Sequence, residues 1–460
     1  MSRRVIATLV LMAWGALAFG AVYPWAFLPL FAGCALVGAV ALLQRTSAGT
    51  MEVVLSISLA SVVIAIGLQL VPMPISTIRW MSPETDMVLR RYAIGYPPLS
   101  QRHALSIQPR ATMLALMAAA ALGIFLLGLA RALTRDDTLQ IARGISALGV
   151  VLAVVGVVQK AMWNGKLYGF WTPIEAGDSF GPFVNRNHFA GWMVMALPLA
   201  IGYFCGRVAP GMRQVKPGLR NRIVWFSSAD ASETMLVGFA VILMALALML
   251  TMSRSGMIGL LVALVILGWF VARRQTSGSR RAVVSGYLIV VALAAAAWTG
   301  FDRIAARFAE SETSSIGGRL ELWADTWRLA ERFPIIGTGL GTYATATLFY
   351  QTVDLNEHLA QAHNDYLQLL AEGGLLVCIP ASLAILAFSW TVRRRFREVS
   401  PESTDYWIRI GAVIGIIAIA VQEVSDFSLQ MPGNAVLFVL LLALAVRQTT
   451  SKRRSVVLHG

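Results

Sequence analysis

The stretch QAHNDYLQLLAEGG, residues 361–374, places a histidine directly before a long apolar segment. The polar residues at its start are His363, Asn364, Asp365 and Tyr366. Neutral imidazole can accept a proton near pH 7, so His363 is a candidate general base. A capping or packing role for the histidine is the alternative, since Asn364 or Asp365 at this point can also serve as a helix N-cap.

If the helix already includes His363, the ring shares a face with Tyr366 and Leu370, whereas Asp365 points away. We therefore expect Tyr366 to orient the base or its substrate. A positive field from nearby arginines would keep the imidazole neutral.

Four further polar stretches border apolar runs. They are FVNRNHFAGW (183–192), TMSRSG (251–256), IGGRLELW (316–323) and VQEVSDFSLQMPGN (421–434). Charges at membrane depth are costly, so Arg186, Arg254 and Arg319 are functional candidates by default. Arginine makes planar, two-pronged contacts with phosphate or carboxylate groups, which suggests an anionic ligand. For Arg254, snorkelling at a helix end or pairing with Asp426 is the alternative to a functional role.

The composition excludes an ordinary soluble domain. The 460 residues are 57% hydrophobic and 13% charged, and the mean hydropathy is +0.67. The apolar residues fall in runs of the length that an α-helix needs to cross a bilayer. We predict an all-α membrane protein with about twelve transmembrane helices. The predicted spans are 5–22, 26–43, 52–71, 112–131, 141–160, 188–206, 234–252, 256–272, 284–300, 363–391, 408–426 and 431–447.

The net charge of +14 reflects topology. With a cytoplasmic N-terminus, most of the 38 lysine and arginine residues fall at cytoplasmic segments, as the positive-inside rule requires. We therefore expect no nucleic-acid partner. The three cysteines, Cys34, Cys205 and Cys378, all lie in apolar spans, and we expect neither a metal site nor a cofactor.

This topology divides the chain into four parts. Residues 1–300 hold helices 1–9 with the periplasmic segments 72–111 and 161–187. The other parts are a large periplasmic loop over 301–362, helices 10–12 over 363–447, and a basic cytoplasmic tail over 448–460. The segment 72–111 is rich in proline and cannot form one continuous helix. We predict a short surface helix over residues 81–92.

The large loop contains an amphipathic pattern. In RLELWADTWRLAERF (319–333), Leu320, Trp323, Trp327 and Ala330 share one face, which predicts a helix on the membrane surface. Glycines at 337, 339 and 341 follow it; such an alternation marks a flexible turn or lets backbone approach a phosphate.

The predicted topology brings the polar clusters to one side of the membrane. The clusters at 186–188, 254, 319 and 363–366 and the Asp426 carboxyl all face outward, while Glu423 lies about one turn deeper. Since the positive-inside rule drives arginines to the other side, those at the outer face require an anionic partner.

Taken together, FVNRNHFAGW, SRSG, the GRLELW…GTGLG run and AHNDYLQLLAEGG resemble the O-antigen ligase and polymerase superfamily of bacterial inner membranes. The resemblance covers roughly residues 180–375, and LSIQPRAT (105–112) is also similar. It implies a metal-independent, inverting glycosyltransferase of the GT-C kind, in the inner membrane with its active site facing the periplasm. The implied donor is a glycan on undecaprenyl pyrophosphate, and the acceptor is lipid A-core for a ligase or another lipid-linked glycan for a polymerase.

The resemblance also implies roles for residues. His363 is the expected catalytic residue, and Arg319, Arg254 and, less directly, Arg186 the expected pyrophosphate ligands. The expected supporting residues are Tyr366, Asp365, Asn187, His188 and Asp426. His188 is expected to act structurally, by hydrogen bonding at its helix start.

The shared motifs do not separate ligase from polymerase, although we favour the ligase. A polysaccharide-lipid transporter and a membrane scaffold are the remaining alternatives. A transporter usually places its ionisable groups at the membrane midplane, whereas here they gather at one face.

Overall fold

The computed structural model describes residues 1–43, 50–96, 101–173, 178–213, 220, 229–274, 315–353 and 358–448. Its long helices are α1 (Arg3–Leu17), α2 (Pro24–Leu42), α3 (Thr50–Leu68), α6 (Pro109–Ala132), α7 (Arg135–Ala161), α8 (Arg186–Arg213), α10 (Ala229–Leu250), α11 (Arg254–Arg274), α16 (Asp365–Glu398), α17 (Thr404–Gln422) and α18 (Pro432–Val446). The other elements are η1 (Phe19–Ala21), α4 (Ile75–Met81), α5 (Pro83–Tyr92), α14 (Ser315–Arg332), α15 (Tyr343–Tyr350), η2 (Ser428–Gln430), and an antiparallel pair formed by β1 (Met73–Pro74) and β2 (Arg102–His103).

The protein is an all-α membrane protein. Within the described residues, nine helices are long and apolar enough to cross a membrane, and α18 is a shorter apolar helix. The helix α1 is 15 residues long, like α18. The predicted span at 284–300 lies outside the described residues. The remaining predicted spans each coincide with one helix, to within a few residues at most ends.

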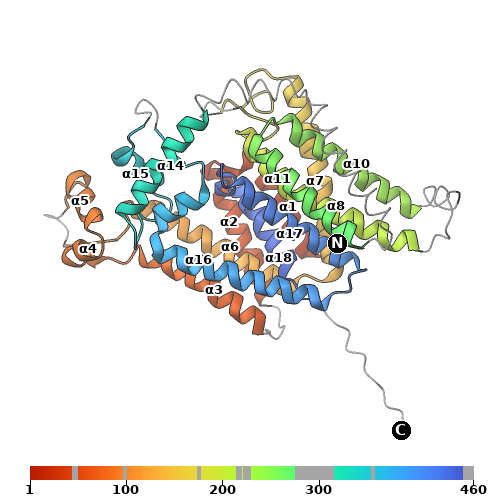
Figure 1. Cartoon of the computed structure of the whole chain (residues 1–460), viewed down its shortest axis with the longest axis horizontal. Helices are drawn as coiled ribbons and strands as arrows, with labels where there is room; N and C mark the ends of the chain where they lie inside the picture. Colours follow the sequence, from red (N-terminus) through yellow and green to blue (C-terminus); the bar gives the residue numbers. More distant parts are fainter. Residues whose placement is uncertain are drawn as a thin grey trace, which may run out of the picture.

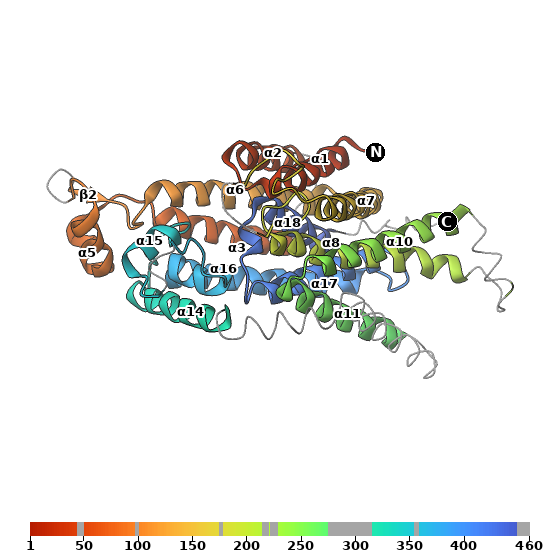
Figure 2. The same cartoon turned by 90° about the horizontal axis from the view of Figure 1, so that it is seen from above.

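The short helices gather at one end of the bundle. Figure 2 shows α5, α14 and α15 beside the ends of α3, α6 and α16 on the left, while the N-terminus, at the start of α1, lies to the right of them. Figure 1 shows the same separation. The predicted topology, in which segments 72–111 and 301–362 share a side and the N-terminus lies across the membrane from them, stays a prediction.

The helix predicted at 319–333 is α14; of the face predicted to lie on the membrane surface, Leu320 and Trp327 are exposed and Ala330 is buried. Leu322, Thr326 and Leu329 are buried, whereas Leu320 and Trp327 are half exposed. The helix therefore packs one side against the protein and leaves two large apolar side chains outside, at a position suited to lipid headgroups.

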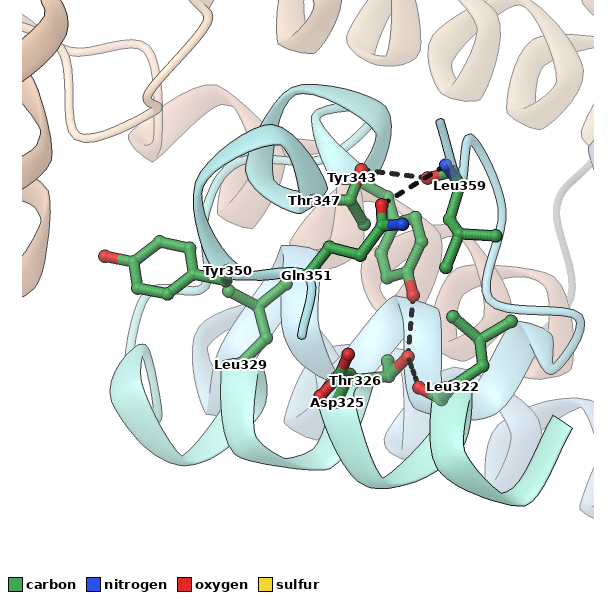
Figure 3. Close-up of a pocket in the computed structure, with 9 residues that line it drawn as sticks. All are labelled: Leu322, Asp325, Thr326, Leu329, Tyr343, Thr347, Tyr350, Gln351 and Leu359. Carbon is green, nitrogen blue, oxygen red and sulfur yellow. Dashed lines mark hydrogen bonds between the residues drawn. The ribbon is translucent and has the colours of Figure 1, made fainter. Parts of the chain in front are cut away.

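Hydrogen bonds join α14 to α15, and join these two helices to residues that follow α15 (Figure 3). The hydroxyls of Thr326 and Tyr343 lie 2.7 Å apart, and Thr347 Oγ1 donates to the Leu359 carbonyl at 2.8 Å. Asp325 accepts bonds from the backbone N–H groups of Thr352 and Val353. These contacts make the described part of the large loop a packed unit.

The helix α16 is broken inside the membrane-crossing part. Gly374 has φ = 54°, a left-handed conformation, so the regular helical hydrogen bonds stop there. The freed N–H groups of Leu375 and Leu376 donate instead to the carbonyls of Pro334 and Ile335, at 2.9 and 2.8 Å. The segment after α14 is thereby bonded directly to the break.

The glycines predicted to form a flexible turn or a phosphate loop lie against this break. Gly337, Gly339 and Gly341 all have positive φ, at 73°, 110° and 81°. A Cβ at Gly337 would overlap the backbone of Glu372 and Gly373. The alternation therefore allows two backbones to meet, and the glycine-rich loop, defined here as residues 337–342, is tied to α16.

We predict that Gly337→Ala lowers the free energy of unfolding by at least the roughly 1–3 kcal/mol typical of a residue forced into left-handed backbone. The reason is the positive φ combined with the overlap at Glu372. Thermal unfolding in detergent measures the change. Gly123→Ala is the matched control, because a Cβ there meets nothing within 4 Å. Equal melting temperatures for the two variants would contradict this account of the loop.

Candidate functional site

His363 is held in a strained backbone conformation. Its φ is 49°, in the left-handed region that side chains other than glycine rarely adopt. Two bonds anchor the preceding residue: the Ala362 carbonyl accepts from Trp323 Nε1 at 3.1 Å, and its N–H donates to Gln368 at 3.0 Å. Such strain persists only where the surroundings fix it, and it concentrates at functional sites.

The helix α16 begins after His363, at Asp365. Asn364 is the N-cap, and its side chain accepts from the N–H groups of Tyr366 and Leu367. The predicted N-cap is thus confirmed at Asn364. The predicted helical face shared by His363, Tyr366 and Leu370 is wrong, because a residue before the cap does not follow helical spacing. The Tyr366 hydroxyl donates to the Ala420 carbonyl at 2.7 Å.

Phe427 brings two histidines together. The rings of His363 and His188 each meet the Phe427 ring edge-to-face, with centroids 4.7 and 4.8 Å away. His188 is buried near the start of α8. Nδ1 of His363 and Nε2 of His188 are both buried and have no hydrogen-bond partner among the described residues. Segments far apart in sequence therefore converge on one aromatic ring.

Arg319 acts on this cluster from α14. Burial, and to a lesser extent the positive charge of Arg319, together lower the pKa of His363 to about 4. The imidazole is therefore neutral over the whole physiological range. Arg319 also acts on Asp426: burial raises the pKa of that carboxyl to about 6, while Arg319 opposes the rise. The Arg319 charge thus acts on both His363 and Asp426, and the role of the three residues in one outer site stays a prediction.

Asp426 links this cluster to the start of α11. Its carboxylate is fully buried and accepts from Ser255 Oγ at 2.9 Å and from the Phe427 N–H at 2.9 Å. Arg254, the first residue of α11, immediately precedes Ser255 and is partly exposed. Arg254 therefore stands next to the residue that binds Asp426.

The other predicted residues lie around α8. Arg186 forms an ion pair with Asp178 at 2.6 Å and begins the helix. The Asn187 carbonyl accepts from Gln422 and Ser428, at 3.1 and 3.2 Å. These bonds attach the start of α8 to the segment between α17 and α18.

Two carboxyl groups lie together beside the start of α16. The Asp365 N–H donates to the Glu423 carbonyl at 3.1 Å, and Asp365 Oδ1 accepts from Gln430 at 2.6 Å. Burial, together with the adjacent Asp365 carboxylate, raises the pKa of Glu423 well above its usual range. The pair therefore holds a proton at neutral pH, since two buried carboxylates in contact do not both ionise.

Glu372 connects the glycine-rich loop to this region. Its carboxylate accepts from the N–H groups of Gly341 and Tyr343, at 2.9 and 2.8 Å. Gln368, one turn earlier, donates to Gln430 at 3.2 Å and to Glu372 at 3.4 Å. A continuous set of polar contacts thus runs from Asp365 to the loop.

Sequence reasoning missed several of these residues. They are Phe427, Glu372, Gln368, Gln430 and Gln69, which bonds the Ile336 and Glu372 carbonyls at 2.7 and 2.9 Å. Glu372 and Gln368 carried a usable signal, because both interrupt an apolar span, where a polar side chain needs a partner. Phe427 carried none, since aromatic residues are common at membrane edges.

Among the described residues, no group of three His, Cys, Asp or Glu side chains is arranged to hold a metal ion. The chemistry available to the cluster is a neutral imidazole with an unpaired ring nitrogen, within the field of the Arg319 guanidinium group. Such a set can accept a proton and bind an anion.

We predict that Arg319→Gln raises the pKa of His363 from about 4 toward its ordinary value, because one of the two causes of the shift is removed. NMR titration of ¹³C-labelled histidine measures it, with the His363 signal assigned from its loss in His363→Gln. Arg328→Gln, in the same helix but paired with Asp325, is the control. An unchanged pKa of His363 in Arg319→Gln would show that the Arg319 charge does not act on the imidazole.

A comparison with known families finds one match that covers part of the chain. Residues 239–382 match the family model described as O-antigen ligase, a region that includes Arg254, Arg319 and His363 but not Arg186 or Asp426. No curated protein matches the chain. The resemblance recognised in the sequence is thereby confirmed for this region, and the chain carries an O-antigen ligase family domain over residues 239–382.

Proposed function

We propose that this protein is a glycosyltransferase that works at the periplasmic face of the bacterial inner membrane. It moves a glycan from undecaprenyl pyrophosphate to a sugar hydroxyl, and it acts as an O-antigen ligase with lipid A-core as acceptor. The observation that carries the proposal is the neutral His363 imidazole within reach of the Arg319 charge, inside the region matched by the O-antigen ligase family.

The reaction is one displacement at the anomeric carbon. The acceptor oxygen forms the new bond, the bond to the pyrophosphate oxygen breaks with its electron pair, and the acceptor proton passes to His363. A single displacement inverts the anomeric configuration. The pyrophosphate leaves as an anion, so it needs charge neutralisation more than a general acid. Arg319 and Arg254 supply that charge without requiring a metal ion.

The low pKa of His363 fits a reaction in which the donor binds before the imidazole acts as a base. In the empty site, burial and Arg319 keep the ring neutral and weakly basic. A pyrophosphate bound to the arginines would offset their charge, which raises the pKa of the ring and makes it a better base. The base is therefore strengthened only when the donor is present.

A polymerase that joins two lipid-linked glycans is the alternative within the same family, since the matched region does not choose an acceptor. A polysaccharide-lipid transporter is a more distant alternative. Against transport, the ionisable cluster described here lies at helix ends, at His363, Arg254 and Asp426.

We predict that His363→Ala lowers kcat about 10²- to 10⁴-fold, the range for loss of a general base, with the protein level and donor affinity retained. Transfer of labelled glycan by purified protein measures it. His358→Ala is the control, because His358 lies in the same loop, is exposed, and bonds only the Ala344 carbonyl among the contacts described. Wild-type turnover in His363→Ala would remove the histidine from the mechanism.

Deletion of the gene distinguishes the two acceptors. For a ligase we expect long chains to vanish from lipid A-core while full-length chains accumulate on the lipid carrier, as seen by gel electrophoresis of both fractions. For a polymerase, single repeats would replace long chains on lipid A-core. A normal pattern in both fractions would contradict either assignment.

A further inference from the structure

We infer that the protein binds its acceptor glycolipid on the side of the bundle formed by α2 and α6. The sugar lies in a polar cleft between α6, α16 and the glycine-rich loop, and the hydrocarbon anchor lies in the groove between α2 and α6. This inference rests on the proposed function and adds to it the place and the chemistry of the second substrate.

The polar cleft suits sugar hydroxyls. Its volume is about 400 Å³, within the range of small-molecule sites. The polar side chains that line it are Gln361, Asp365, Gln368, Glu372 and Gln430. Carboxylate and amide oxygens accept hydrogen bonds from hydroxyl groups, and amide N–H groups donate hydrogen bonds to them. The lining includes no lysine or arginine, so this cleft does not offer the charge that a pyrophosphate requires.

An apolar groove continues from the cleft. Its volume is about 620 Å³, and its sides are faces of α2, including Phe27 and Phe31, and of α6, including Leu114 and Ala118. Three residues line both spaces, namely Ala115, Gly341 and Gln430. A molecule with a sugar head and a hydrocarbon chain can therefore occupy both without a break.

The groove has the depth of one membrane leaflet. On α6 it runs from Ala111 to Ala121, about 15 Å of helix at 1.5 Å per residue, or half of the hydrocarbon core. Nearer the cytoplasmic ends the two helices touch: a Cβ on Gly128 would overlap the Gly38 backbone. The helices thus meet closely in the inner half and leave the groove in the outer half.

The groove lies across the bundle from the arginines. Figure 2 shows α2 and α6 on one side and α11 and α14, which carry Arg254 and Arg319, on the other, with α16, α17 and α18 between them. A donor held through its pyrophosphate belongs at the arginines. The second lipid substrate then needs a separate entry, and the α2–α6 groove provides one.

The cleft also reaches the catalytic segment. Asp365, which lines the cleft, follows His363 by two residues, and Gln430, which bonds Asp365, follows Phe427 by three. An acceptor in the cleft therefore approaches the backbone that holds the proposed base. The donor would approach the same backbone from the arginine side.

The test fills the groove with a bulky side chain and measures binding of the acceptor in the absence of the donor. Ala32→Trp places a large ring in the groove, and Leu36→Trp places the same ring on the same helix outside it, where Leu36 is 65% exposed to the surroundings. The probes are lipid A-core extracted from a strain lacking O-chain and the same material with its acyl chains removed. Binding without donor gives Kd, and glycan transfer gives KM for donor and acceptor. A third variant, Gln361→Leu, removes a polar group from the cleft.

For Ala32→Trp we expect Kd and KM for the intact acceptor to rise about tenfold, with KM for the donor and all values for the deacylated acceptor unchanged. Gln361→Leu should weaken both acceptors, and Leu36→Trp neither. A rise in the donor KM instead would assign the groove to the donor chain and overturn the inference. Equal losses in the two tryptophan variants would overturn it too.

The two proposals fail differently. If wild-type protein binds lipid A-core through the groove but transfers nothing to it, the proposed function is wrong and the binding site stands. If it transfers glycan and Ala32→Trp binds and uses the intact acceptor normally, the function stands and the groove assignment is wrong.

Discussion

The break in α16 at Gly374 is the constraint on which the rest of the outer site depends. A broken helix in a membrane exposes backbone groups that lipid cannot satisfy. Here residues 334 and 335 accept the freed N–H groups, and Gln69 of the loop after α3 bonds the Glu372 carbonyl. The large loop is thus joined to the membrane bundle by backbone hydrogen bonds, which fix it more firmly than side-chain packing alone.

That junction extends to the reacting groups. Glu372 holds the glycine-rich loop, Gln368 of the same helix bonds the residue before His363, and Trp323 of α14 bonds that residue from the other side. Because α14 also carries Arg319, the proposed base and the guanidinium group are positioned by one set of contacts. Such support from neighbouring residues is what holds a catalytic geometry in place.

The sequence predicted the elements better than the contacts between them. Long apolar runs identify membrane helices because a bilayer sets their length, and the positive-inside rule orients them. For the same reason the gathering of His363, Arg319 and Asp426 at one end was predictable. The break at Gly374 was not, since glycine is common in membrane helices, and the helix start at Asp365 was misplaced by two residues.

Two residues show why that misplacement mattered. A residue inside a helix and one before its cap point in unrelated directions, so Tyr366 bonds the Ala420 carbonyl while the His363 ring meets Phe427. Likewise, the glycines at 337–341 carry a pattern common to turns and phosphate loops. Only the position of α16 beside them shows that they meet backbone.

The Phe427 ring between His188 and His363 has a consequence for how many charges this part of the protein can hold. Two imidazolium ions packed against the same hydrocarbon ring would repel strongly where water does not screen them. The buried His188 therefore remains uncharged whenever its counterpart is charged. If His363 is the base of the proposed reaction, the pair of histidines can therefore take up only one proton at a time.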